Sequence, residues 1–448
     1  MKPPRVAALL FAALTAVYLA DGGFAVANGA KPNVWLSIAV LDHHALTFAR
    51  AEEPFMFTPR GEKYYLTATV LPGRYAGTFG LGAGLTALPA LAALRVAVGH
   101  LESHPWLLWY AAKAIAAACV AASAAFVFLA ALTFTTQRRA LAVALAYALG
   151  GCAWSIASQA LYQHGPNMLF LALGAYLVIR GRDLGAGLAL GAATWCRPTS
   201  AVVVVCVGVW LLVRDYRRCA RFTIGAAALV VPLALYNWHW LGAPWNTGQT
   251  ARAAEIARGK TGVADPWQTP FAYGLAGLLV SPSRGLFIFS PLFLLSFIAL
   301  VRIFDWRDDR FAPLRPLAVG AIGLIAIAAK WFDWWGGWTY GYRPLVDVTP
   351  LLALMLVPLV DTVFARRWRR VAAGVVLGWS IAVQALGAFT YDTDGWNASN
   401  GRDIDRAKWR DRLWSFDDWQ IGYYATHLAE ARRARADAIA QFVEHPED

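Results

Sequence analysis

Charged residues are scarce in this chain of 448 residues. Asp, Glu, Lys and Arg together make up 15% of it, hydrophobic residues make up 58%, and the mean hydropathy is +0.45. A soluble domain needs more charge than this to cover its surface, so the composition excludes an ordinary water-soluble globular protein. We expect an all-α polytopic membrane protein that spends most of its length in a lipid bilayer.

Paired cysteines are also lacking. The five cysteines lie in or beside apolar segments, and none of them belongs to a CxxC spacing. This pattern excludes a disulfide framework and a thiolate metal site, and we expect no cofactor. The formal net charge is +12, but Lys and Arg stand in short clusters between apolar runs. The charge therefore indicates membrane topology rather than binding to nucleic acid.

These positive clusters predict the topology, because short cytoplasmic loops collect Lys and Arg and each crossing of the bilayer changes the side. The clusters occur at residues 2–5, 138–139, 180–183, 214–221, 302–310 and 366–370. With these loops in the cytoplasm, the apolar runs give a bundle of about 11 transmembrane helices. The N-terminus then lies inside and the C-terminus outside.

Two apolar stretches depart from this pattern. Residues 80–101 contain Pro89, Arg95 and several glycines, and a crossing there would break the alternation of sides, so we expect a helix at the outer membrane interface. Residues 184–213 would give two spans of only about 22 Å each, shorter than the roughly 30 Å core of a bilayer. They form either two half-helices that meet at Arg197 and Pro198, or one span.

The topology divides the chain into two parts. Residues 1–390 form the transmembrane domain. Its outer side carries a first loop of about residues 22–105, which we expect to contain interfacial helices, and further loops of about residues 237–285 and 330–345. Residues 391–448 form a short polar tail on the same side, which we expect to be partly helical.

Unusual residues are densest in residues 330–350, KWFDWWGGWTYGYRPLVDVTP. Asp333, Arg343 and Asp347 stand there at a predicted membrane boundary, together with Lys330, four tryptophans and two tyrosines. Charges at that depth are costly unless they are paired or line a wet cavity, so we take the first three as candidate substrate-binding residues. The alternative is an aromatic belt with internal salt bridges.

The first outer loop holds the candidate catalytic carboxylates. Asp42 interrupts the apolar end of an expected interfacial helix, and Glu53 follows Glu52 ahead of an apolar turn. A carboxylate at a bilayer surface among apolar neighbours acquires a raised pKa, which suits a general base. Lys63 and Arg74 are candidate ligands for a phosphate group. The alternative is a set of ordinary solvated and snorkelling side chains.

Two further outer segments supply candidate substrate ligands. His164 lies in the short turn YQHGP between two expected spans, where the alternative is a turn residue that is satisfied locally. Arg284 and Gly285 stand directly before an expected helix, whose N-terminal dipole would favour an anion there. The alternative for Arg284 is the polar turn that precedes many spans.

The order of these segments resembles that in bacterial membrane glycosyltransferases of the GT-C superfamily, which is related to aminoarabinose transferases, protein O-mannosyltransferases and oligosaccharyltransferases. The resemblance covers most of the chain as a set of short motifs. They are LDHHALTF, YAGTFGLGAGLTALP, YQHGP, CRPTS, YNWHWLGAPWNTG, LLVSPSRGLFIFSP and WWGGWTYGYRPLVDVTP. It implies transfer of a sugar, with inversion, from a polyprenyl-phosphate carrier to a glycan or lipid acceptor at the periplasmic face of the bacterial inner membrane.

The resemblance also implies roles for residues. An acidic residue of the first loop would act as base or position the acceptor, but Asn28 stands where several relatives place an Asp. Glu52, Glu53 and Asp21 therefore stay open as alternatives to Asp42.

Cationic and acidic residues outside the first loop also acquire roles from this resemblance. Arg284 and Arg343 match positions where a cation would neutralise the phosphate leaving group. Asp333 and Asp347 are the alternatives if the first loop supplies no base. The turn at His164 lacks the acidic metal ligands of oligosaccharyltransferase relatives, so we expect chemistry without a metal, or a metal held elsewhere.

Two other functions stay open. A glycan ligase or polymerase that uses the same carrier would need a long, open acceptor pocket. A non-enzymatic transporter or flippase for such lipids would place charges near the bilayer midplane and show related halves. Most charges here cluster at the outer ends of the expected spans, and Lys113 is the exception.

Overall fold

The computed structural model of the protein describes residues 1–24, 29–52, 54–57 and 65–444. Within these residues most of the chain is helical, and the only regular strands are the short antiparallel pair β1 (Leu66–Ala68) and β2 (Tyr75–Gly77). Thr67 lies opposite Ala76 in this pair. The expectation of an all-α fold is therefore confirmed.

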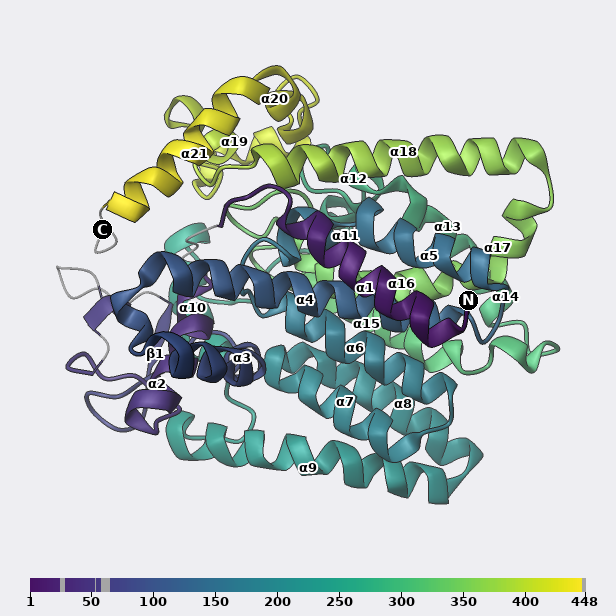
Figure 1. The fold of residues 1–448 in the computed structure, drawn as a ribbon, viewed down its shortest axis with the longest axis horizontal. Coiled ribbons are helices and arrows are strands. Elements are labelled where there is room, and N and C mark those ends of the chain that lie inside the picture. The colour runs from purple at the N-terminus through teal and green to yellow at the C-terminus, as the bar shows by residue number, and fades with distance from the viewer. Residues whose placement is uncertain (25–28, 53, 58–64, 445–448) are drawn as a thin grey trace.

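Long helices lie side by side along one axis of the molecule (Figure 1). They form from the apolar runs of the sequence, in which most charged residues lie at the ends and Lys113 of α4 is an exception. In chain order the elements of this bundle are α1 (Pro3–Leu19), α4 (Pro105–Ala131), α5 (Gln137–Gly150), η3 (Ala153–Ala157), α6 (His164–Ile179), α7 (Asp183–Cys196), α8 (Ala201–Arg214), α9 (Tyr216–Leu241), α11 (Phe271–Val280), α12 (Leu286–Phe289), α13 (Leu294–Ile298), α14 (Leu300–Ile303), α15 (Leu314–Lys330), η7 (Arg343–Val348), α16 (Thr349–Met355), α17 (Val357–Phe364) and α18 (Arg367–Thr390).

Three helices of the described chain, α4, α9 and α18, are long and apolar enough to cross a membrane. The segments 343–355 and 357–364 reach that length together, across a bend of 54°. The other apolar helices are shorter than a full span. Length and composition thus support the expectation of a helical membrane protein.

Of the two alternatives for residues 184–213, the structure has two separate helices that meet at Arg197 and Pro198. α7 ends at Cys196 and α8 begins at Ala201, with Arg197 in an extended conformation and a short 3-10 turn from Pro198 between them. Proline disfavours a helical conformation for the residue before it, which explains why the helix breaks at Arg197. The break brings a cationic side chain into the interior of the bundle.

The expected outer loops gather at one end of the bundle. Figure 1 shows the N-terminus at the opposite end from α2 (Lys31–His43), α3 (Gly82–Val98) and α10 (Gly248–Thr261). The loop after α15 belongs to the same end, because Lys260 of α10 forms an ion pair with Asp333. The stretch 80–101, expected at the interface, thus forms the helix α3 beside the first loop.

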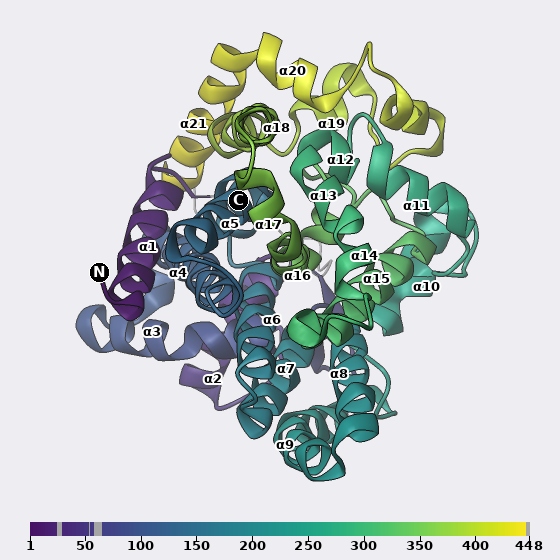
Figure 2. The same ribbon diagram turned by 90° about the vertical axis from the view of Figure 1, so that its right-hand side faces the viewer.

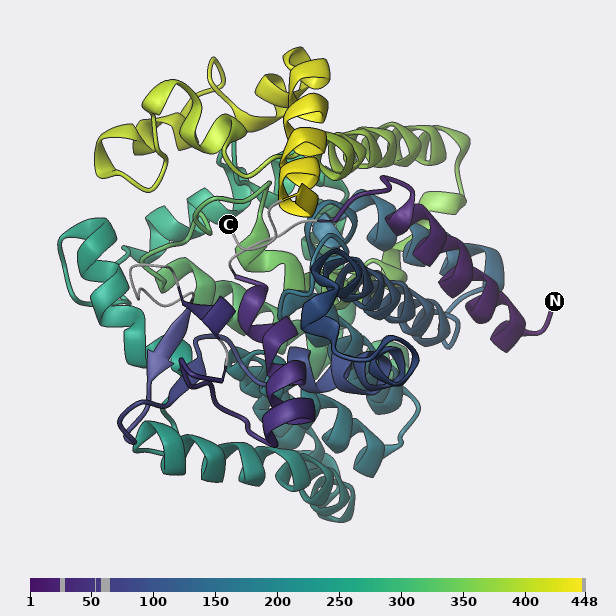
Figure 3. The same cartoon turned by 60° about the vertical axis from the view of Figure 1, so that its left-hand side comes forward.

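The C-terminal tail is a packed part of the protein. It contains α19 (Gly395–Ala398), the 3-10 helix η9 (Ala407–Trp414), α20 (Gln420–Thr426) and α21 (Leu428–Glu444). Figure 3 shows α21, in yellow, reaching toward the purple N-terminal third of the chain. The ring of Phe442 packs edge-on against Phe24 at 5.7 Å and Trp109 at 6.4 Å. This contact closes a space between the tail and the bundle.

α16 lies at the centre of the molecule. Viewed along the bundle axis, it is surrounded by α4, α5, α6 and α15 (Figure 2), and it contacts all four. Each of its residues, from Thr349 to Met355, is buried. Because η7 leads directly into this central helix, its side chains are held in the middle of the bundle.

Candidate functional site

A buried ion-pair cluster lies where three elements meet. η7 carries Asp347, α6 begins with His164, and Arg197 stands in the break between α7 and α8. Oδ2 of Asp347 lies 3.0 Å from Nδ1 of His164, and Arg197 donates to the same carboxylate. The carboxylate accepts a hydrogen bond from the N–H at Nδ1, so Nε2 is left as the basic ring nitrogen. Two residues predicted from the sequence, His164 and Asp347, are thus brought together.

A cavity of about 600 Å³ lies beneath α21, and we call it the α21 cavity. Tyr162, Trp338 and Tyr391 contribute aromatic rings to its wall, and Asp392 and Arg435 contribute charge. These side chains come from the η3–α6 turn, the loop before η7, the end of α18 and α21. The cavity therefore depends on the C-terminal tail for one of its walls.

Asp392 and Asp394 are the two carboxylates of this wall, and within the described residues neither of them forms an ion pair. Oδ1 of Asp392 accepts a hydrogen bond from the backbone N of Gly395. Burial raises the pKa of Asp392, and the neighbouring Asp394 raises it further. A carboxylate of this kind can accept a proton nearer to neutral pH than a solvated Asp does.

A second cavity, of about 330 Å³, lies between α8 and α15, and we call it the α8–α15 cavity. Val202, Leu324 and Ile327 line it with aliphatic side chains, and Arg197 and Asn167 lie at its wall as well. The cavity thus combines an apolar surface with a cation. This combination suits a ligand that carries a hydrocarbon chain and an anionic group.

Arg343 lines neither cavity, but it directly precedes Pro344, which lines the α8–α15 cavity, and it follows closely after Tyr340, which lines the α21 cavity. Its guanidinium donates to one backbone carbonyl and has no carboxylate partner in the part of the chain that the structure describes. Burial raises the pKa of the hydroxyls of Tyr162 and Tyr391, and the charge of Arg343 acts on both in the opposite direction. Arg343 is therefore a cation close to both phenols and free to bind an anion.

Asp21 belongs to a separate buried ion-pair cluster, which reaches the α21 cavity through Arg435. It forms ion pairs with Lys113 of α4 and Arg435 of α21. Nζ of Lys113 also donates to the backbone O of Gly23 at 2.7 Å. The lysine expected inside the membrane is thus paired with a carboxylate, and two cations neutralise Asp21.

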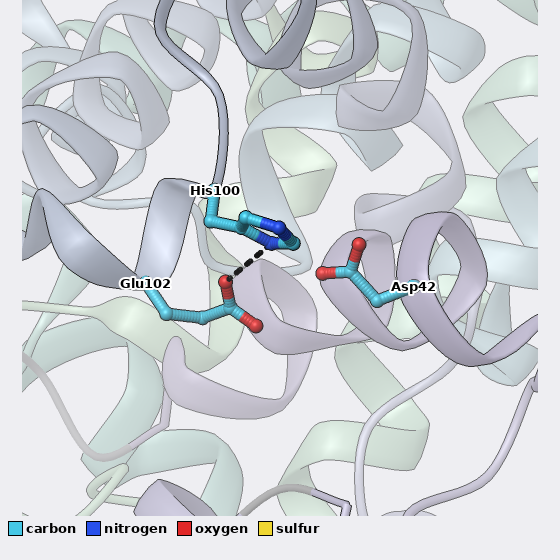
Figure 4. Close-up of side chains that lie close together, drawn as sticks. All are labelled: Asp42, His100 and Glu102. Atoms are coloured by element: carbon cyan, nitrogen blue, oxygen red, sulfur yellow. Dashed lines mark ion pairs between the residues drawn. The ribbon is translucent and has the colours of Figure 1, made fainter.

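The first-loop residue Asp42 lies apart from both cavities. It ends α2 and forms an ion pair with Arg95 of α3. His100 and Glu102 lie next to it (Figure 4), with Nδ1 of His100 3.9 Å from Oε2 of Glu102. The three side chains bring potential ligand atoms within 4.8 Å of one another. Because Arg95 already neutralises Asp42 and would repel a second cation, we assign no metal-binding role to this group.

Of the remaining first-loop candidates, Arg74 is already paired within the loop. Both terminal nitrogens of Arg74 donate to the carboxylate of Glu52, at 2.6 and 2.9 Å. This bidentate pair occupies the guanidinium expected to bind phosphate. Glu53 and Lys63 lie outside the described residues.

Arg284 is fully buried in the contact between the α11–α12 turn and the C-terminal tail. Its Nε donates to the backbone O of Trp335 at 2.9 Å. Its terminal nitrogens donate to Oε1 of Gln420 at 2.8 Å and to Oδ1 of Asn397 at 2.9 Å. Its guanidinium also packs 5.1 Å from the ring of Trp396. With its donors satisfied by neutral acceptors, Arg284 joins protein segments, and we leave it out of the proposed substrate site.

Asp333 has a similar joining role. Nζ of Lys260 lies 2.9 Å from both Asp333 and Asp405, so one lysine of α10 links the loop after α15 to the tail. Burial alone would lower the pKa of Lys260, but the two carboxylates raise it above its usual range. The lysine therefore stays charged and holds the three segments together.

Several residues of the site were not singled out from the sequence as ligands. Arg197 was noted only as a helix break, and Asp392 and Arg435 were assigned to a polar tail. An arginine directly before a proline inside an apolar run is itself a signal, because an intramembrane cation needs a partner. No comparable signal marks Asp392, whose position depends on how the tail folds back.

No model of a known protein family matches this chain, and no curated protein sequence is similar to it.

Proposed function

We propose that this protein is an inverting glycosyltransferase of the bacterial inner membrane, related to the GT-C superfamily, with about 11 membrane spans and a periplasmic active site. Its donor is a sugar linked to polyprenyl phosphate, and its acceptor is a glycan or lipid of the cell envelope. The resemblance of the sequence motifs supports this proposal. The gathering of the expected outer loops at one end of the bundle supports it as well (Figure 1).

The observation that carries the proposal is the pair of arginines beside the α8–α15 cavity. The aliphatic wall from Val202, Leu324 and Ile327 suits a polyprenyl chain that enters between α8 and α15. Arg197 lies on the wall of this cavity, and Arg343 lies just beyond Pro344. A phosphate held there would lie near Arg197, which is also paired with Asp347, and near Arg343, which has no carboxylate partner in the described residues.

The chemistry requires such a cation. During transfer the bond between the anomeric carbon and the phosphate oxygen breaks, and the electron pair leaves with the carrier phosphate. A fixed guanidinium beside this oxygen stabilises the negative charge that develops, more in the transition state than in the ground state. Arg343 suits this role better than Arg197, because Asp347 already occupies part of the Arg197 guanidinium.

A transporter for the same lipids is less consistent with these contacts. Lys113, the charge expected deep in the membrane, is 1% exposed and paired with Asp21. Such a buried ion pair joins helices and is not available to a moving substrate. Asp392, which forms no ion pair in the described residues, lies instead on the wall of the α21 cavity, and Arg343 directly precedes Pro344 of the α8–α15 cavity.

The test uses the full-length protein purified in detergent or lipid vesicles. It is incubated with polyprenyl-phosphate sugars and envelope extracts, and loss of sugar from the carrier is measured. We expect the wild-type protein to consume one donor, and Arg343→Ala to lower this rate by about 100-fold or more. Arg366→Ala, which removes an exposed arginine at the other end of the bundle, is the matched control and should leave it unchanged.

The proposal fails if no donor is consumed with any extract while Arg343→Ala also leaves the envelope glycans of cells unchanged. Consumption of donor by wild type and Arg343→Ala at equal rates would remove Arg343 from the site.

A further inference from the structure

The two cavities differ in chemistry, which indicates that they take different ligands. Both cavities combine aromatic rings with amide, acid and cationic groups, but the α21 cavity is the more polar of the two, and the α8–α15 cavity carries the aliphatic wall of Val202, Leu324 and Ile327. Gln159 and Arg435 lie on the wall of the α21 cavity, together with Trp338 and Tyr391. Ring faces pack against the C–H face of a sugar, and amide and charged groups hydrogen-bond to its hydroxyls. The α21 cavity therefore fits a saccharide better than a hydrocarbon chain.

The carboxylates near the site differ in what neutralises them. Asp21 forms ion pairs with Lys113 and Arg435, and Asp347 is held by Arg197 and His164. An opposite charge in direct contact stabilises the ionised form and makes a carboxylate a weaker base. Asp21 and Asp347 are therefore poor proton acceptors in this arrangement.

Asp392 is different. It lines the α21 cavity, carries no cation in the described structure, and follows directly after Tyr391, which lies near Arg343. The cavity wall that holds Asp392 is thus connected through Tyr391 to the place proposed for the carrier phosphate.

We propose that the α21 cavity binds the acceptor through a sugar unit and that Asp392 accepts the proton of the attacking hydroxyl. This inference rests on the proposed glycosyl transfer. The acceptor oxygen forms a bond to the anomeric carbon of the donor, and the bond from that carbon to the phosphate oxygen breaks. The electron pair leaves with the carrier phosphate, and the hydroxyl proton moves to the carboxylate of Asp392. Attack from the side opposite the leaving phosphate inverts the configuration.

The surroundings of Asp392 are consistent with this role. Burial and the adjacent Asp394 raise its pKa. Tyr424 of α20 donates to its backbone O, and Arg435 of α21 faces the same cavity without an ion pair to it. Burial raises the pKa of the Tyr423 phenol, and the charge of Asp392 raises it further. Asp394 is the other carboxylate on the wall of this cavity in the described residues, and it also forms no ion pair there.

The closing experiment compares Asp392→Asn with Asp417→Asn in the full-length protein. Asn keeps the oxygen that accepts from the backbone N of Gly395, so the fold should be retained, whereas Asp417 is an exposed acid of the same tail. General base catalysis contributes typically 10²–10⁴-fold, so we expect Asp392→Asn to lower kcat by at least about 100-fold. Donor binding, measured with labelled polyprenyl-phosphate sugar, should stay within about twofold of wild type. Asp417→Asn should behave as wild type.

The pH profile provides a readout that a merely structural role would not change. In wild type, log(kcat/KM) should rise with pH as Asp392 loses its proton, with a midpoint above the usual Asp value of about 4. This limb should be absent in Asp392→Asn, and Asp392→Glu should restore part of the rate with a shifted limb.

The acceptor is offered in separate arms as a soluble envelope glycan, as vesicles that contain a glycolipid, and as vesicles of phosphatidylglycerol. Transfer to either sugar-bearing acceptor supports the inference, and the arm identifies the source of the sugar. Transfer only to phosphatidylglycerol overturns it, as does an Asp392→Asn protein with wild-type kcat and an unchanged pH limb. Wild-type protein that consumes no donor in any arm overturns the proposed function and this inference together.

Discussion

Arg284 and Arg343 were both expected to bind the carrier phosphate, and the structure predicts opposite consequences for their loss. Arg284 is fully buried and donates to four acceptors in other segments of the chain. Arg343 is partly exposed and donates to a single backbone carbonyl. We expect Arg284→Met to lower stability and Arg343→Met to lower activity.

The expected loss of stability in Arg284→Met follows from the acceptors that lose their hydrogen bond. Arg284→Met leaves the backbone O of Trp335, the backbone O of Gly337 and Oδ1 of Asn397 without this donor, whereas Oε1 of Gln420 keeps its hydrogen bond from the backbone N of Gly341. Each buried acceptor left unpaired costs about 1–3 kcal/mol, so we expect a loss on the order of 4 kcal/mol after local relaxation. An unfolding entropy of about 2.1 cal/mol/K per residue over 448 residues converts this loss to a decrease in Tm of about 4 °C.

The expected effect of Arg343→Met is on the reaction rate. Arg343→Met removes one hydrogen bond at a partly exposed position, so the expected decrease in Tm is about 1 °C or less. Loss of a fixed charge that stabilises the leaving group costs about 2.7–4 kcal/mol in the transition state, which corresponds to a rate lowered by about 10²–10³-fold.

Both variants are purified in the same detergent, and thermal unfolding and donor consumption are measured on one preparation. The assignment is refuted if Arg343→Met melts as early as Arg284→Met, since Arg343 would then be a structural residue. It is equally refuted if Arg284→Met keeps the wild-type Tm and loses donor turnover, since the buried arginine would then act on the substrate.

Three further predictions follow from individual contacts. Lys113→Met should lower stability by about 3 kcal/mol, because Asp21 loses one of two buried cations, and adding Asp21→Asn should restore part of it in a thermal unfolding series. Val202→Trp should fill the α8–α15 cavity and raise the KM for the donor at least about tenfold, while Val205→Trp, on an exposed face of the same helix, should not. Lys260→Met should leave two carboxylates unpaired and make the tail more sensitive to limited proteolysis, with unchanged fragments arguing against the proposed link.

Local patterns in the sequence determined the helical class, the break at Arg197 and Pro198, and which loops lie together. Each of these depends on neighbours along the chain: apolar runs form helices, a proline interrupts them, and alternating crossings bring every second loop to the same end. The residues 330–350 were also recognised as a place where charges need partners.

The identity of those partners was decided only by the tertiary structure. Asp347 meets His164 from 183 positions away, and Asp21 meets Arg435 from 414 positions away. An apolar pattern indicates which face of a helix is buried, but it does not indicate which helix covers that face. For the same reason the sequence did not indicate that the tail folds back over the bundle and brings Asp392 to the α21 cavity. Packing of distant segments thus decided which carboxylates are paired with cations.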